Sequence, residues 1–156
     1  MLDSRVASRR RYLVCDPRHF AVRYAINPWM RPDRPVDVLL AQRQWRTLVD
    51  TYRAHGHTVE SVTPEPALPD MVFAANAAVV VEGRVFGSLF LAPERRPESV
   101  PYEAWFKAEG YEVQHPESVC EGEGTWCRPG AGSWQAPGSA PLPGRTARRR
   151  STSGCR

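Results

Sequence analysis

Apolar side chains recur regularly from residue 11 to residue 124, and this pattern stops within one residue. The stretch EGEGTWCRPGAGSW spans the break, and after Thr125 the only large aliphatic residue is Leu142. Pro, Gly and Ser fill 13 of the 31 positions from 126 to 156. Such a segment buries too little apolar surface to offset the entropy of ordering it. The sequence therefore predicts one folded domain over 11–124 and a disordered tail over 125–156.

Charge follows the same division. The tail from 126 to 156 holds six of the 21 basic residues and no acidic residue, which leaves 15 basic against 17 acidic side chains before it. The net charge of +4 is thus a property of the tail and is no evidence that the folded part binds nucleic acid. Residues 1–10 are also basic and are expected to form a disordered leader.

Helix and strand patterns alternate along the folded part. RYLVC (11–15) is typical of a buried strand, 35–56 of an amphipathic helix that ends at Gly56, and HTVESV (57–62) of a strand. Residues 71–90 favour strands, with a hairpin tip at Glu82-Gly83. A second helix is expected around 102–108, and YEVQ (111–114) resumes a strand. This order predicts an α/β fold.

The two passages from helix to strand resemble each other. YRAHGHTV (52–59) and FKAEGYEV (106–113) share an aromatic, a basic residue, Ala, Gly and Val at an offset of 54 residues. Repetition at such an offset favours repeated βαβ-type units, of the kind that build propellers and solenoids.

Cysteine usage bounds the compartment and the metal chemistry. Cys15, Cys120, Cys127 and Cys155 show neither metal-ligand spacing nor a dense disulfide pattern. No secretory leader and no membrane-spanning apolar run are evident. We expect a cytoplasmic protein with no metal, no cofactor, no membrane contact and no nucleic-acid partner, and a homo-oligomer is left open.

Polar residues at strand ends and tight turns are the candidate site residues. They could surround a planar cation with oxygen acceptors and meet an anionic end with arginine. Each also has a purely structural explanation, as a turn residue, a solvated loop residue or a surface charge around a glycine turn. The candidates are Asn27, Asp70, Asn76, Arg95 and Glu121.

Four segments, in this order, resemble one family of proteins. YLVCDPRHFAVRYAINPWM, LPDMVFAANAAVVVEGRVF, APERRPES and EGEG are similar to the N-terminal half of guanidine-group-modifying enzymes. These are arginine dihydrolases, dimethylarginine dimethylaminohydrolases and amidinotransferase-like proteins. The resemblance covers roughly 11–124. It implies a partial pentein, a five-bladed α/β propeller, with about two ββαβ-type units in this chain.

The resemblance also implies a chemistry and a set of roles. In the family a Cys thiolate attacks the guanidinium carbon, an amine or ammonia leaves, and water resolves the thiouronium intermediate, with a His as acid and base. Arginine or a methylated arginine is then the expected small-molecule partner. Glu121 matches the catalytic glutamate and Asp70 an acidic residue beside the guanidinium. Asn27 and Asn76 match substrate contacts, and Arg95 matches the arginine that holds the substrate carboxylate.

The sequence departs from the family pattern after Gly124. The family has Asp where Thr125 stands, and no His-Leu-Asp segment or matching nucleophilic Cys follows. A shifted reading frame would restore that Asp and explain the Arg- and Gly-rich tail; a natural basic tail is the alternative. We therefore expect a truncated hydrolase lacking its nucleophile. The alternatives are an inactive product without an enzymatic role and a nucleic-acid-associated protein with a basic tail.

Overall fold

The computed structural model describes residues 8–124. The expected tail over 125–156 lies outside this range, and so do residues 1–7 of the expected leader over 1–10. The first unit is a βαβ crossover. Strand β1 (Arg11–Cys15) pairs in parallel with β2 (Thr58–Val62), with Arg11 opposite Thr58 and Cys15 opposite Val62. Helix α1 (Val38–Ala54) connects them, as parallel strands require a long crossover.

The sequence explains where α1 begins and ends. The carboxylate of Asp37 caps the first turn by accepting a 2.8 Å hydrogen bond from the backbone N–H of Leu40. Gly56 follows the helix with φ of +78°, a conformation that costs glycine little. The expected inward face is only partly buried: Val49 is 3% exposed, whereas Leu48 is 47% exposed.

The second unit has the order ββαβ. Strands β3 (Ala78–Val81) and β4 (Arg84–Gly87) form an antiparallel hairpin, and β5 (Val113–Gln114) adds to β4 in parallel. Glu82 and Gly83 both have positive φ, so the tip is the turn that the sequence predicted. Helix α2 (Ser99–Ala108) precedes β5 and starts three residues before the expected position.

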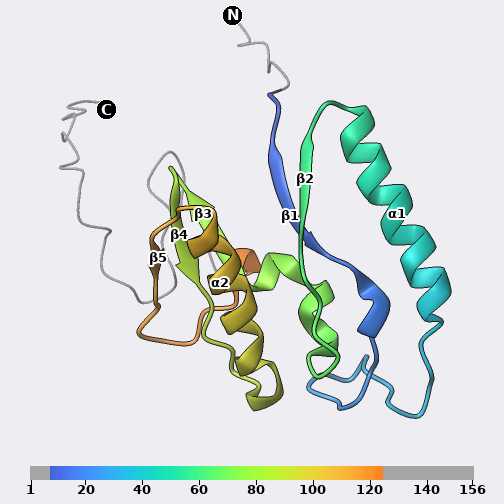
Figure 1. The fold of residues 1–156 in the computed structure, drawn as a ribbon. Helices are drawn as coiled ribbons and strands as arrows, with labels where there is room; N and C mark the ends of the chain where they lie inside the picture. Colours follow the sequence, from blue (N-terminus) through green and yellow to red (C-terminus); the bar gives the residue numbers. More distant parts are fainter. Residues whose placement is uncertain (1–7, 125–156) are drawn as a thin grey trace, which may run out of the picture.

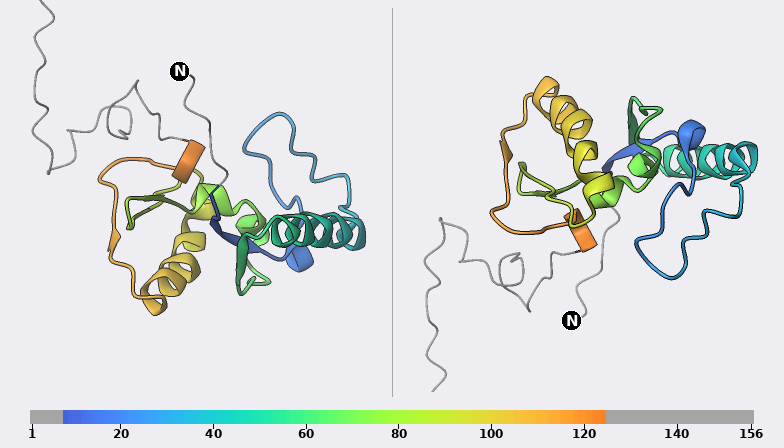
Figure 2. Two further views of the ribbon diagram at one scale, coloured as in Figure 1. Left: turned by 90° about the horizontal axis from the view of Figure 1, so that it is seen from above. Right: turned by 90° about the horizontal axis from the view of Figure 1, so that it is seen from below.

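The repeated junction is confirmed. Both helices end before a glycine with positive φ, Gly56 at +78° and Gly110 at +82°, and both lead to a strand that pairs in parallel with an earlier one. The fold is therefore mixed α/β, as predicted. The two units share this junction, but within residues 8–124 only the second has the ββαβ order that was expected of both. Figure 1 shows the two small sheets side by side, with α1 on the outer side of the β1–β2 sheet and α2 between the two sheets in this view; Figure 2 shows the molecule from above and below.

One expected strand is absent from the structure. Residues 71–76 form two short 3₁₀-helices instead, η2 (Pro69–Val72) and η3 (Ala74–Asn76). Pro69 supplies the fixed φ of a first helical turn. This segment lies between the two units, where its Met71 is 1% exposed and packs in the core with Cys15, Val62 and Tyr102.

No helix within residues 8–124 has the length and apolar character needed to cross a membrane.

Candidate functional site

Asp70 stands in the first turn of η2 and is almost fully buried, with 2% of its surface exposed. Its Oδ2 accepts a 2.5 Å hydrogen bond from the hydroxyl of Tyr24, in the loop between β1 and α1. Burial, together with this bond and the nearby Asp70 charge, raises the pKa of Tyr24. The hydroxyl therefore stays protonated and remains a donor to the carboxylate.

Arg95 and Glu98 form a buried ion pair on the 3₁₀-helix η4 (Pro93–Glu98). They are 6% and 1% exposed, and the guanidinium Nη2 lies 2.9 Å from Oε2 of Glu98. Arg95 Nε also contacts both carboxylate oxygens, at 3.2 and 3.3 Å. Burial raises the pKa of Glu98, and the arginine works against that rise.

Arg95 connects η4 to both short helices of the central segment. Its Nη1 donates to Oδ1 of Asn76 at 3.3 Å, and its Nη2 donates to the backbone oxygen of Asp70 at 3.5 Å. The guanidinium also lies 4.4 Å from the ring centre of Phe90. Asp70, Asn76 and Arg95 thus belong to one hydrogen-bonded cluster, which we call the Arg95 cluster together with Tyr24 and Glu98.

Glu121 is held beside this cluster by the turn that follows it. The short helix η5 (Gly122–Gly124) packs on η3, and Gly122 has φ of +57°. Glu121 accepts a 3.1 Å hydrogen bond from the backbone N–H of Leu91, and its charge is among those that raise the pKa of Glu98. Glu121 therefore lies within electrostatic range of the cluster.

Asn27 occupies an exposed turn in the loop before α1. Its Oδ1 accepts hydrogen bonds from the backbone N–H groups of Trp29, at 3.0 Å, and Met30, at 3.2 Å. This is the geometry of a turn-forming asparagine. The loop still approaches the cluster, because Tyr24, three residues earlier, reaches Asp70.

Sequence reasoning missed three members of this region. Glu98 and Tyr24 complete the cluster, and Phe73 presents a ring that is 47% exposed, 5.8 Å from the Arg95 guanidinium. The i, i+3 spacing of Arg95 and Glu98 was the available signal, but the flanking prolines favoured a solvated loop. That interpretation is wrong for Arg95, whereas Arg96 is exposed.

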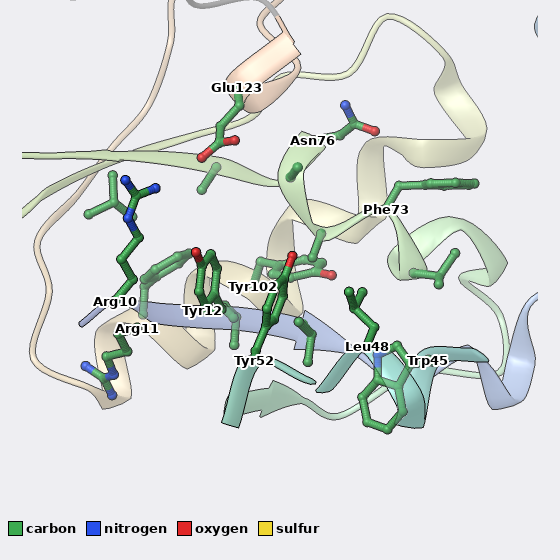
Figure 3. Close-up of a pocket in the computed structure, with 18 residues that line it drawn as sticks. Arg10, Arg11, Tyr12, Trp45, Leu48, Tyr52, Phe73, Asn76, Tyr102 and Glu123 are labelled. Atoms are coloured by element: carbon green, nitrogen blue, oxygen red, sulfur yellow. The ribbon is translucent and has the colours of Figure 1, made fainter. Parts of the chain in front are cut away.

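A separate open cavity of about 650 Å³ lies between β1, α1 and the start of β3. Its lining is largely apolar and aromatic, and it includes Tyr12, Trp45, Leu48 and Tyr52. Asn76 borders it, but Figure 3 shows the Asn76 amide directed away from Tyr12 and Tyr52. The Arg95 cluster therefore lies outside the main volume of this cavity.

The two thiols of the described residues are buried. Cys15 and Cys120 are each 1% exposed. Burial raises the pKa of Cys15 to about 11, so its thiol is protonated at neutral pH. Neither sulfur is accessible to a ligand in this conformation. In the same range, 8–124, no three His, Cys, Asp or Glu side chains gather closely enough to hold a metal ion.

Similarity to known proteins extends over most of the described range. No protein-family model matches the chain. The chain is 42% identical over 120 residues to the N(G),N(G)-dimethylarginine dimethylaminohydrolase of Mycobacterium tuberculosis, covering 77% of this chain and 40% of that protein. It is 35% identical over 144 residues to the bifunctional arginine dihydrolase/ornithine cyclodeaminase AgrE of a Nostoc species, covering 81% of this chain and 20% of that protein.

Solved structures match at the level of the fold as well. The N-terminal domain of ArgZ, a cyanobacterial arginine dihydrolase solved with substrate bound, superimposes with a TM-score of 0.67 at 36% identity. That match covers 74% of this chain and 44% of the ArgZ domain. The chain thus spans well under two thirds of the relatives it matches. Dimethylarginine dimethylaminohydrolase and arginine dihydrolases are thus homologues of this chain, and its fold matches part of their pentein structures.

Proposed function

We propose that residues 11–124 form the guanidino-recognition part of a hydrolase that breaks a C–N bond in arginine or a methylated arginine. The Arg95 cluster, with Glu121 packed beside it, carries this proposal. A guanidinium group has only N–H donors, so a protein that binds it needs fixed oxygen acceptors. The relatives named dimethylarginine dimethylaminohydrolase and arginine dihydrolase support the substrate class.

The proposed roles follow the family resemblance, residue by residue. Glu121 acts on the guanidino group as the catalytic carboxylate, and Asp70 contributes negative charge next to it. Asn76 and Asn27 contact the ligand, and Arg95 binds its carboxylate end. Asp70 is only 2% exposed, which suits an electrostatic role better than an open contact.

We further propose that the sequence as printed binds its ligand without turning it over. Attack on the guanidinium carbon needs a thiolate beside that carbon. Cys15 and Cys120 are each 1% exposed, and the pKa of Cys15 is raised by burial. These observations support a chain in which the nucleophile comes from elsewhere in the family fold. The free thiol of Cys15 is compatible with the proposed cytoplasmic location.

Calorimetric titration and a product assay on purified residues 1–156 test the proposal together. We expect saturable binding of L-arginine or dimethylarginine and none of L-lysine, whose ammonium is not planar. We expect no ammonia, citrulline, ornithine or dimethylamine to form. Asp50→Asn, on the exposed side of α1, is the control variant for Asp70→Asn. Turnover that disappears on Cys15→Ser or Cys120→Ser would contradict the proposal, and so would the absence of guanidino binding.

A further inference from the structure

Glu98 is the most deeply buried acidic side chain of the described residues, with 1% of its surface exposed. It lies at the end of η4, directly before α2. A carboxylate in such a position is costly unless a cation and hydrogen-bond donors satisfy it. Arg95 does so from one helical turn earlier, through Nε and Nη2.

This pairing fixes the plane of the Arg95 guanidinium. Two adjacent nitrogens on one edge of the fork contact the same carboxylate, which leaves the group little freedom to rotate. The ring of Phe90 packs against its face at 4.4 Å. Nη1, on the remaining edge, is thereby directed at Asn76.

The Asn76 amide takes its orientation from that contact. Arginine has only donors, so the group that faces Nη1 at 3.3 Å must be Oδ1, and the Nδ2 amino group faces the other way. The same guanidinium donates to the backbone oxygen of Asp70 at 3.5 Å. The orientation of the Asn76 amide and the position of the Asp70 backbone therefore both depend on where Arg95 is held.

We infer that Glu98 is a positioning residue, which holds Arg95 and through it sets the orientation of the Asn76 amide and of the Asp70 backbone. The effect of Glu98 on ligand binding rests on the proposed function, which assigns Asn76 and Asp70 to the guanidino ligand. Glu98 itself touches no ligand in this scheme. It acts by removing alternative positions of the arginine that bridges η4 to η2 and η3.

Glu98→Gln is the main variant, because it keeps the shape of the side chain and removes its charge. Glu98→Asp keeps the charge and shortens the reach by one methylene. Glu94→Gln, an exposed position on the same short helix, is the matched control. The direct readout is the side-chain amide pair of Asn76 in ¹⁵N–¹H correlation spectra. The second readout is the affinity for L-arginine and for agmatine, the same guanidine without a carboxylate.

In Glu98→Gln we expect the Asn76 amide pair to shift and broaden. We also expect both affinities to fall, that for L-arginine by about tenfold or more and further than that for agmatine, because the variant disturbs both Asn76 and the Arg95 guanidinium assigned to the ligand carboxylate. Glu98→Asp should recover part of both readouts, and Glu94→Gln should change neither. An unchanged Asn76 pair in a folded Glu98→Gln protein would overturn the inference.

Two further outcomes, a wild type that does not bind and a variant that does not fold, still leave the role of Glu98 testable. If the wild type binds neither guanidine, the proposed function fails, and the Asn76 spectrum alone decides the role of Glu98. If Glu98→Gln does not fold, the exchange rate of the Arg95 Nε proton in the wild type decides instead. We expect that proton to exchange slowly because Glu98 accepts it. Exchange as fast as that of the exposed Arg43 on α1 would overturn the inference.

Discussion

A Cβ atom added to Gly122 would lie 2.3 Å from the backbone oxygen of Ala75 and 2.8 Å from the carbonyl carbon of Asn76. Gly122 also has φ of +57°. The absence of a side chain therefore lets the turn after Glu121 rest directly on the residue that Arg95 holds. This contact holds Glu121, the last of the predicted site residues along the chain, beside the Arg95 cluster.

Gly122→Ala tests this close approach, with Gly83→Ala as the matched control. Both glycines have positive φ, but nothing lies within 4 Å of a Cβ at Gly83. We expect Gly83→Ala to cost about 1 kcal/mol from backbone strain. Gly122→Ala should cost about 1–3 kcal/mol more, because backbone must move to relieve the overlap. Urea unfolding measures both, and equal losses would contradict the packing described here.

Tyr24→Phe removes the hydroxyl that donates to Asp70. The buried carboxylate then loses a donor, and we expect a loss of about 1–3 kcal/mol in the free energy of unfolding. Tyr111→Phe is the control, since its hydroxyl accepts a hydrogen bond from Arg11 at the surface and should matter less. A Tyr24→Phe protein as stable as Tyr111→Phe would show that Asp70 does not depend on this bond.

Stability should fall at alkaline pH, and Cys15 is one cause. Burial raises the pKa of its thiol from 9.0 to about 11, so the folded state holds the proton more tightly than the unfolded state does. The resulting stabilisation, about 2–3 kcal/mol, is present below pH 9 and is lost as the pH rises towards 11. Urea unfolding under reducing conditions at pH 8, 9.5 and 11 measures it. Cys15→Ser should flatten the decline, and an identical decline in this variant would refute the assignment.

Arg95→Lys separates the two tasks given to Arg95. Lysine keeps a charge for Glu98 but cannot reach it and Asn76 at once with a planar fork. Nη1 carries two protons, and one of them is donated to Asn76 Oδ1. Within residues 8–124 the second has no acceptor, so it can be donated to a ligand carboxylate. We expect L-arginine affinity to fall more than agmatine affinity. Equal losses for the two ligands would remove the carboxylate-binding role and leave only the positioning role.

Local patterns predicted the regular elements well. The 3.6-residue periodicity and Gly56 located α1, and Glu82-Gly83 located the hairpin, because turns and helix ends are decided by a few adjacent residues. The residues 71–76 were misassigned as a strand. A short apolar run is compatible with a strand or with a helix. In the folded chain this segment is packed between the two units and forms short helices.

The candidate site was less accessible to sequence reasoning. Asp70, Asn76 and Arg95 lie together in the folded chain, and their roles at the site stay predictions. Their place at strand ends and turns made them candidates, and the resemblance supplied the roles. Burial of Arg95 depends on Glu98, Phe90 and the backbone of Asp70, which meet only in the folded chain. Surrounding prolines and charges look the same in a solvated loop and in a buried ion pair.

The most direct test of the central claim is a titration of ¹⁵N-labelled protein with L-arginine, followed at each backbone amide and at the Asn76 side chain. We predict saturable shifts centred on Asp70, Asn76, Glu121 and Gly122, with L-lysine producing none of them. Saturable shifts confined to the Tyr12–Tyr52 side of the open cavity, or no saturable shift at all, would contradict a guanidino site at the Arg95 cluster.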